Sequence, residues 1–256
     1  MIASERERII LDYLRKHRVV STETVTAITG ASVATARRDL KSLGRRGLLE
    51  KKHGGAQALD GMTVPGGNAA IADDDPHLAE KDQIAALAAG LVKSGDIVFL
   101  GAGKTCTLLA RYIRDLDNIK VVTTNINSII ELSASNKASM LLLGGDIHVG
   151  SNYIETLDEY TIRALEKYYF DKVFITVDGV DMDYGYSINF RLQVMLYEYL
   201  MQNSKEFHMM LGKHKFGKRA FIRFCTMERI RSIITNQDID PLYMRYFAEN
   251  GVGILS

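Results

Sequence analysis

The stretch GASVATARRDLKSLGRRGLLEKKHGGA, residues 30–56, constrains the fold of this chain more than any other feature. The Ser32 hydroxyl is placed to cap a helix by accepting from backbone N–H groups of its first turn. An apolar stripe then follows at i, i+3, i+7 and i+10, formed by Val33, Ala36, Leu40 and Leu43. The opposite face carries Ala34, Thr35, Arg37, Arg38, Lys41 and Arg45. The pattern predicts a helix that is buried on one side and basic on the other.

Shorter signals on both sides of this helix complete a known arrangement. Upstream, apolar residues share one face of a first helix, namely Ile9, Ile10, Tyr13 and Leu14. A second helix is capped by Ser21 or Thr22, points Val25 and Ile28 inward and stops at Gly30. Downstream, Gly47 ends the basic helix, and Gly54-Gly55 is expected to turn a two-stranded ribbon. The sequence thus predicts a winged helix-turn-helix with Lys51, Lys52 and His53 near the tip of the wing.

The charges of this segment indicate its partner. Residues 1–55 hold 12 Lys and Arg against 6 Asp and Glu, whereas the rest of the chain holds 20 against 25. Arginine pairs with guanine edges or clamps phosphates, and the N-terminus of a helix attracts a phosphate. A solvated basic surface is the alternative, but the capped helix pair and the basic wing together favour DNA binding. The residues expected to contact DNA are Ser32, Ala34, Thr35, Arg37, Arg38, Lys41, Arg45, Lys51, Lys52 and His53.

On these residues the chain resembles the DeoR family of bacterial transcriptional regulators. The family signature is a Ser-x-x-Thr-x-Arg-Arg-Asp-Leu helix, followed by a Gly-Leu turn and a basic stretch that ends in His-Gly-Gly-Ala. The matching positions are Ser32, Thr35, Arg37, Arg38, Asp39, Leu40, Gly47, His53, Gly54, Gly55 and Ala56. Ala36 stands where the family usually has Ile. The resemblance implies a winged helix whose third helix contacts operator DNA.

The remainder of the sequence predicts a second domain. Residues 60–76, DGMTVPGGNAAIADDDP, have no helical or strand period and are interpreted as a linker between residues 1–59 and 77–256. From residue 77 onward, amphipathic helices alternate with short apolar strands such as DIVFL, IKVVTT and KVFITV. This alternation predicts an α/β domain with a mostly parallel sheet and helices on both faces. Thr156 and Glu159 are expected to form a capping box for one of these helices.

Three loops that follow predicted strands are candidates for a ligand site, because ligands of such sheets bind beyond the carboxyl ends of the strands. The first is LGAGKTCT, in which Gly101 and Gly103 allow backbone N–H groups to face an anion, and Lys104 and Thr105 add donors. The loop matches neither the Walker A nor the GxGxxG spacing, and a plain βα turn is the alternative. The others are TTN, which ends at Asn125, and LLGGD.

The family resemblance extends to this domain and implies a ribose-5-phosphate isomerase-like fold that binds a phosphorylated sugar. It assigns to the effector site Gly101, Gly103, Lys104, Thr105, Thr124, Asn125, Gly144, Gly145, Asp178 and Lys215. Asp178 belongs to the matching stretch FDKVFITVDGVDMDYGYS, and Lys215 to GKHKFG. Within this domain the chain departs from the family where Gly101 and Gly212 replace acidic residues and where His214 replaces a serine. An acidic residue expected near Gln193 is also missing.

The sequence therefore predicts a cytoplasmic transcriptional regulator that represses a carbohydrate-metabolism operon and responds to a phosphorylated sugar or related anion. Operator DNA, the effector and further copies of the chain, as a dimer or tetramer, are its expected partners. The two cysteines and six histidines show no ligand spacing, so neither a metal nor a cofactor is predicted. An isomerase-like enzyme with a DNA-binding module is the alternative. Asp178 and Asp181 would then be its acid and base, but the other residues that such a reaction needs are not evident.

Overall fold

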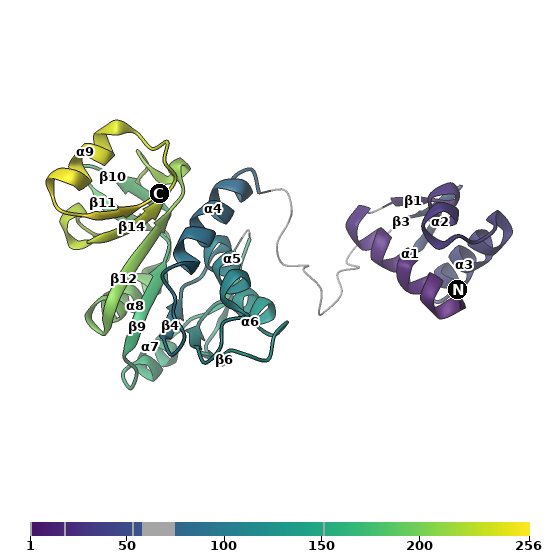
Figure 1. The fold of residues 1–256 in the computed structure, drawn as a ribbon, viewed down its shortest axis with the longest axis horizontal. Helices are drawn as coiled ribbons and strands as arrows, with labels where there is room; N and C mark the ends of the chain where they lie inside the picture. Colours follow the sequence, from purple (N-terminus) through teal and green to yellow (C-terminus); the bar gives the residue numbers. More distant parts are fainter. Residues whose placement is uncertain (1, 18, 53, 58–74, 151) are drawn as a thin grey trace. The chain divides into compact units, whose positions relative to one another are not determined.

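The computed structural model in Figure 1 describes residues 2–17, 19–52, 54–57, 75–150 and 152–256. The chain forms two compact units, Met1–Ala69 and Ala70–Ser256, and each is described by itself. Of the predicted linker, residues 60–74 lie outside the described residues.

The N-terminal unit is a winged helix. Its elements are α1 (Ala3–His17), β1 (Val19–Ser21), α2 (Thr22–Thr29), α3 (Val33–Arg45), β2 (Glu50–Lys52) and β3 (Gly55–Gln57). The three strands form an antiparallel sheet in the order β1-β3-β2, so the predicted ribbon is confirmed and gains a strand that the sequence analysis missed. The core is built from the predicted apolar positions, including Ile10, Leu14, Val25, Leu40 and Leu43.

Both predicted helix caps of this unit are present. The Ser21 hydroxyl accepts from the N–H of Thr24 at the start of α2, and that of Ser32 accepts from the N–H of Thr35 at the start of α3. Gly30 ends α2 with a φ of 65°, a left-handed conformation that glycine adopts without a steric penalty. The turn between the two helices therefore follows from the local sequence.

Two expectations for this unit were wrong in detail. Val33 is 47% exposed, because it is the first residue of α3 and lies beyond the edge of the core. Gly55 is a strand residue paired with both Lys52 and Ser21, rather than part of the turn. A Cβ atom on Gly55 would lie 2.2 Å from the carbonyl oxygen of Val20, so glycine there allows β1 to approach β3.

The C-terminal unit is an α/β domain around a seven-stranded sheet in the order β15-β14-β12-β9-β4-β5-β6. All six strand pairs in this sheet are parallel, as predicted. Its strands are β4 (Ile97–Leu100), β5 (Lys120–Thr123), β6 (Ser139–Leu142), β9 (Phe170–Ile175), β12 (Ser204–Leu211), β14 (Ser232–Thr235) and β15 (Gly253–Leu255). The helices are α4 (Leu78–Ala89), α5 (Lys104–Ile113), α6 (Ile126–Leu132), α7 (Glu159–Leu165), α8 (Arg191–Gln202) and α9 (Pro241–Glu249).

Alternating strand residues bury two cores on opposite faces of the sheet. On β4, Val98 and Leu100 belong to the core that includes residues of α4, α5 and α6, whereas Phe99 belongs to the core that includes residues of α7, α8 and α9. Figure 1 shows α4, α5 and α6 together on one side of the sheet. Helices on both faces explain why these strands are nearly continuous apolar runs.

Smaller elements complete the C-terminal unit. They are the hairpin β7 (Ile147–Val149) and β8 (Ile154–Thr156), the three-stranded sheet of β10 (Gly179–Asp181), β11 (Gly185–Ile188) and β13 (Ile222–Cys225), and the 3-10 turns η1 (Lys213–Lys215) and η2 (Met227–Arg229). The predicted capping box of Thr156 and Glu159 was wrong. Asp158 and Thr161 cap α7 instead, because Thr156 lies in β8 and its hydroxyl donates to carbonyl groups of neighbouring loops. None of the described helices is both long enough and apolar enough to cross a membrane.

Candidate nucleic-acid interface and effector site

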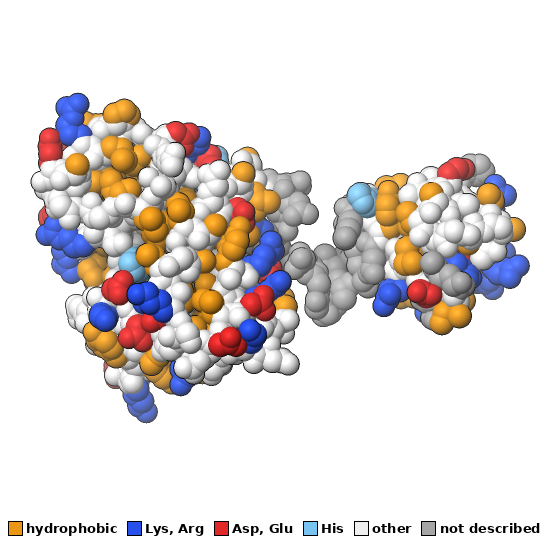
Figure 2. All heavy atoms as spheres, in the orientation of Figure 1, with side chains coloured by type: hydrophobic (Ala, Val, Ile, Leu, Met, Phe, Trp, Pro, Cys, Tyr) orange, Lys and Arg blue, Asp and Glu red, His pale blue; other side chains and the backbone are white. Residues whose placement is uncertain are grey.

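The outer face of α3 presents the side chains that the sequence analysis assigned to DNA. Ser32, Ala34, Arg37, Arg38, Lys41 and Arg45 are exposed. Thr35 is half-buried, and its hydroxyl oxygen lies 3.0 Å from that of Ser32. Figure 2 shows Lys and Arg side chains on the surface of this unit. A capped helix with an exposed basic face has the form that enters the major groove in helix-turn-helix proteins.

The wing adds a second basic element. Lys51 and Lys52 are exposed on β2, and the ammonium of Lys52 lies 2.6 Å from a carboxylate oxygen of Glu50. His53, which was assigned to the tip, lies outside the described residues. Glu50 therefore pairs with Lys52, whereas the charge of Lys51 is not paired with Glu50.

Ion pairs to α1 hold α3 in place. Asp39 is buried on the inner side of α3, and its Oδ2 lies 2.8 Å from Nε of Arg6. A second pair joins Arg46, just after α3, to Glu7 at 2.7 Å. Asp39 had been noted as part of the family signature, but its partner could not be identified from the sequence because the two residues are 33 positions apart.

In the C-terminal unit, a cavity of about 150 Å³ lies where several strands and loops converge. It is lined mainly by polar and charged side chains. The lining residues are Lys81, Ala102, Gly103, Lys104, Thr105, Asn152, Tyr153, Thr176, Asp178, Ile188, Gln193, Tyr197, Met210, Gly212, His214 and Lys215. Five of the predicted effector residues are brought together here, namely Gly103, Lys104, Thr105, Asp178 and Lys215.

The start of α5 forms one wall of this cavity. Gly103 is the N-cap of α5, has a φ of 106° and makes no side-chain cap hydrogen bond. Lys104 and Thr105, in the first turn, are both buried. The N-terminus of a ten-residue helix that opens into a polar cavity favours an anion there.

Lysines and one aspartate set the charge of the cavity. Nζ of Lys215 lies 3.8 Å from Oδ1 of Asp178. Burial lowers the pKa of Lys215, although Asp178 partly opposes that effect by favouring the ammonium form. Lys81 also lines the cavity and forms an ion pair with Asp75. An anionic ligand would find three lysines around one small cavity.

Other predicted effector residues do not line the cavity but hold the loops that form it. Asn125 is fully buried and caps α6 by accepting from the N–H groups of Asn127 and Ser128. Its amide donates to the carbonyl groups of Gly101 and Gly103, which ties the loop before α5 to the start of α6.

The remaining predicted effector residues that do not line the cavity make backbone hydrogen bonds to neighbouring segments. The N–H of Gly101 donates to the carbonyl oxygen of Phe174 on β9, and the Thr124 carbonyl accepts from the N–H of Thr156. Gly144 and Gly145 are exposed, and the Gly144 carbonyl accepts from the Thr161 hydroxyl. A Cβ on Gly145 would lie 2.3 Å from that hydroxyl oxygen, so this glycine is required by packing.

The acid–base pair considered for an enzyme is not assembled in the cavity. Only Asp178 lines it, and Oδ2 of Asp178 accepts from the backbone and side chain of Asn189. Asp181 instead lies 2.8 Å from a guanidinium nitrogen of Arg219 and caps the turn before β11. Asp178 lies after β9 and Asp181 is the last residue of β10, and only Asp178 lines the cavity.

Several lining residues were missed as site residues by the sequence analysis, in particular Lys81, Asn152, Tyr153, Gln193 and His214. They come from segments far apart in the chain, and no local spacing connects them. Gly212 and His214, two positions at which the chain departs from the family pattern, line the cavity. A Cβ on Gly212 would lie 2.5 Å from Cε1 of His214, so glycine at 212 leaves room for the imidazole at 214.

A buried carboxyl lies behind the cavity. Glu155 is 1% exposed, and its Oε1 accepts from the amide of Gln193 at 2.8 Å. Its Oε2 has no hydrogen-bond partner among the described residues. Burial raises the pKa of Glu155 to about 7. This residue supplies a carboxyl beside Gln193, where the sequence analysis found the expected acid missing.

A winged helix with an exposed basic face, in one chain with an α/β domain that holds a polar cavity, defines a DNA-binding regulator with a sensor domain. The comparisons agree. A model of the DeoR-like helix-turn-helix domain matches residues 6–61, and one of the DeoR C terminal sensor domain matches residues 76–237. The chain belongs to the DeoR family of transcriptional regulators.

Curated relatives match along nearly the whole chain. The HTH-type transcriptional regulator IolR of Bacillus subtilis is 25% identical over 95% of each chain. The HTH-type transcriptional repressor GlcR of the same organism is 28% identical over 100% of this chain and 96% of its own. The transcriptional repressor AccR of Agrobacterium fabrum is 32% identical over 71% of this chain and 69% of its own.

Solved structures show more distant similarity. Ribose 5-phosphate isomerase A from Methanocaldococcus jannaschii aligns with a TM-score of 0.38 and 17% identity over 55% of each chain. A probable sor operon regulator from Shigella flexneri aligns with a TM-score of 0.42 and 10% identity over 65% of this chain and 88% of its own.

Proposed function

We propose that this DeoR-family regulator is a cytoplasmic repressor of a carbohydrate-metabolism operon, and that a phosphorylated sugar bound in the cavity of the C-terminal unit controls its affinity for DNA. The cavity carries this proposal: Gly103 at the start of α5 and the lysines 81, 104 and 215 surround one small polar space. Relatives described as repressors, such as GlcR, support the direction of control.

The anionic part of the ligand fits the side of the cavity formed by α5. Backbone N–H groups at a helix N-terminus and a nearby ammonium are the usual partners of a phosphate. Gly103 supplies an open backbone and Lys215 a positive charge, so the two contribute different contacts to one anion.

The rest of the lining suits hydroxyl groups. Asn152, Tyr153, Gln193 and Asp178 offer donors and acceptors of the kind that sugar hydroxyls require. At about 150 Å³, the cavity is small for a drug-sized ligand and fits a compact metabolite better.

Control of DNA binding requires that the ligand bind two states of the protein with different affinities. Operators with two-fold symmetry call for a dimer or tetramer, and we assign the self-association to the C-terminal unit. The proposal treats the chain as a regulator rather than an isomerase, because Asp181 is held away from the cavity by Arg219.

The test begins with DNA fragments selected by the protein from the genome of its source. Release of such a fragment is then measured against sugar phosphates, the corresponding uncharged sugars and inorganic phosphate. The proposal expects release by one or more sugar phosphates only. A response to uncharged sugars alone would contradict it, and turnover of pentose phosphates would favour the isomerase instead.

A further inference from the structure

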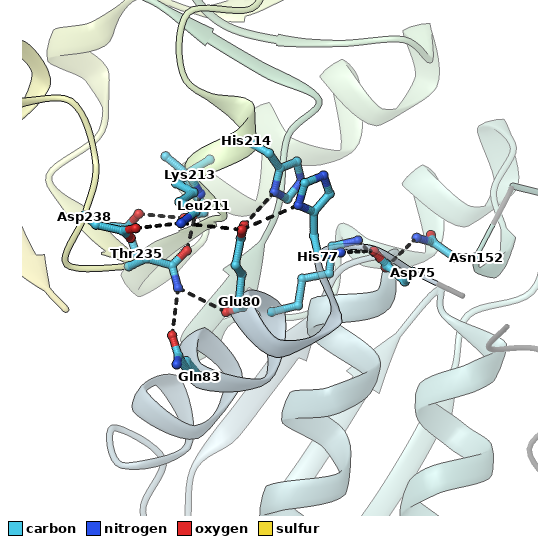
Figure 3. A network of polar contacts seen from close by, with 12 residues as sticks. Asp75, His77, Glu80, Gln83, Asn152, Leu211, Lys213, His214, Thr235 and Asp238 are labelled. Carbon is cyan, nitrogen blue, oxygen red and sulfur yellow. Dashed lines mark hydrogen bonds and ion pairs between the residues drawn. The ribbon is translucent and has the colours of Figure 1, made fainter. Parts of the chain in front are cut away.

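A second cluster of chemical interest lies next to the cavity, at the start of α4. Nδ1 of His214 lies 3.1 Å from Oε2 of Glu80, and Nδ1 of His77 lies 3.6 Å from Oε1 of the same carboxylate. The donor atoms of the three residues all lie within 4.8 Å of one another. In Figure 3 both imidazole rings point toward the Glu80 carboxylate.

The fold holds these side chains at one point although His77 and His214 are 137 positions apart. His77 is the N-cap of α4 and Glu80 lies in its first turn, three residues on, whereas His214 belongs to η1. The N–H of His77 donates to Asp75, which also binds Lys81 and Asn152. The backbone N–H of His77 is therefore held by a carboxylate that two other residues also hold in place.

The donor set is that of a transition-metal site. Two imidazole nitrogens and one carboxylate oxygen, with a fourth position left open, are the ligands of many zinc sites. Metal–ligand bonds of about 2.0–2.2 Å in a tetrahedron place neighbouring donor atoms about 3.3–3.6 Å apart. The two imidazole-to-carboxylate separations, 3.1 and 3.6 Å to the two oxygens of Glu80, are close to that range, and all three donor atoms lie within 4.8 Å of one another.

Glu80 gives the cluster a carboxylate, and two nearby lysines are paired with other carboxylates, Lys81 with Asp75 and Lys213 with Asp238. The two imidazole rings stack with centroids 3.8 Å apart and an interplanar angle of 9°. The neighbouring Lys213 is drawn to Asp238 at 2.6 Å and lies farther, 3.9 Å, from Glu80.

We propose that His77, Glu80 and His214 bind a divalent transition metal of the zinc class at the edge of the effector cavity. His214 also lines that cavity, so the open fourth position lies close to where a ligand would bind. The metal site does not depend on the proposed sugar-phosphate effector. The alternative is a hydrogen-bonded cluster in which Glu80 only accepts from the two imidazoles.

The test uses the full chain without a histidine tag, treated with a chelator and then titrated with Zn²⁺ by calorimetry and with Co²⁺ by visible absorption. We expect one metal per chain and the intense visible bands of tetrahedral Co²⁺. His77→Ala, His214→Ala and Glu80→Gln should each weaken Zn²⁺ binding by about tenfold or more. His17→Ala, which removes an exposed histidine of the N-terminal unit, should bind as the wild type does.

Gly212→Ala provides a test that leaves every ligand in place. The added Cβ would lie 2.5 Å from the His214 ring and displace it. The backbone at Gly212, with φ of −69° and ψ of 146°, is open to any residue, so the fold is expected to persist. We expect a loss of Zn²⁺ affinity comparable to that of a ligand variant. Failure of the wild type to bind one metal, equal binding by the ligand variants, or a thiolate-to-Co²⁺ absorption band would overturn the proposal.

Discussion

Nε of Arg6 lies 2.8 Å from Oδ2 of Asp39, and this ion pair joins α1 to the buried side of α3. Asp39→Asn keeps the shape of the side chain and removes the buried negative charge that faces the guanidinium of Arg6. We expect a lower melting temperature for the winged-helix unit and several-fold weaker operator binding, because the orientation of α3 is no longer fixed. Thermal unfolding and fluorescence anisotropy with labelled operator measure the two effects.

Glu7→Gln is the matched control, since it removes the other ion pair between the same segments. Arg46 in that pair is 54% exposed, and exposed pairs contribute little to stability. Equal losses in Asp39→Asn and Glu7→Gln would show that the buried pair has no special role.

Base contacts and phosphate contacts should be separable on the DNA-binding surface. Arg37 and Arg38 are exposed on α3, and Arg37→Ala or Arg38→Ala should cost about 1–3 kcal/mol of operator affinity where the residue contacts a base. Lys51→Ala in the wing should weaken binding to all duplexes alike. It should also reduce the slope of log affinity against log salt concentration by about one. Lys52→Ala should have the smaller effect of the two lysines, because Lys52 already pairs with Glu50.

Binding isotherms on the operator and on an unrelated duplex, each at several salt concentrations, distinguish these roles. Unchanged operator affinity in both arginine variants would remove α3 as the element that contacts the bases.

The sequence predicted the elements whose signals are local. Ser32 caps α3, Val33–Arg45, as expected, because a serine hydroxyl needs only the N–H groups of the next turn. Apolar runs likewise identified the strands of the parallel sheet, since strands covered on both faces are apolar throughout.

Tertiary contacts decided what the sequence could not show. Thr156 had the spacing of a cap, yet strand pairing in β8 directs its hydroxyl to the Leu143 carbonyl. Asp178 and Asp181 are three residues apart, but Arg219 binds only the second. His77 and His214 meet only because α4 packs beside η1, and no spacing in the chain anticipates that contact.

The C-terminal unit should fold without the winged helix. Its two hydrophobic cores contain none of the described residues of the N-terminal unit. A fragment of residues 75–256 keeps Asp75, whose contacts with Lys81 and the N–H of His77 would be lost if the chain began at residue 77. We expect this fragment to be folded and self-associated, and not to bind DNA. Sedimentation of a monomer would contradict the assignment of oligomer contacts to this unit.

The buried Glu155 predicts a specific pH dependence. Its pKa of about 7 in the folded protein exceeds the ordinary value of 4.5, so between these values the folded state holds a proton that the unfolded chain has released. The free energy of unfolding therefore falls as the pH rises toward 7 and levels off above it, a total loss of about 3 kcal/mol. Glu155→Gln should abolish this loss and be the more stable protein at pH 8.

Near-ultraviolet circular dichroism in urea at pH 5 to 8.5 measures this effect in the full chain, because all tyrosines except Tyr13 belong to the C-terminal unit. Glu159→Gln, which alters an exposed carboxylate on α7, should keep the pH slope of the wild type. A wild-type slope in Glu155→Gln would mean that other groups cause the dependence.

The final prediction concerns the anion contacts of the cavity. Lys215→Ala removes a charge-assisted contact and should weaken binding of the responding sugar phosphate by about 1.5–3 kcal/mol. Lys218→Ala is its control, since Lys218 is exposed and does not line the cavity.

Gly103→Val acts differently. It would place a branched side chain at the start of α5, where the φ of 106° disfavours any residue but glycine, so its melting temperature must be measured alongside. Neither Lys215→Ala nor Gly103→Val alters the winged helix, so both proteins should bind operator without ligand but fail to release it at concentrations that release the wild type. A normal response in Lys215→Ala would show that the ligand's charge is bound elsewhere.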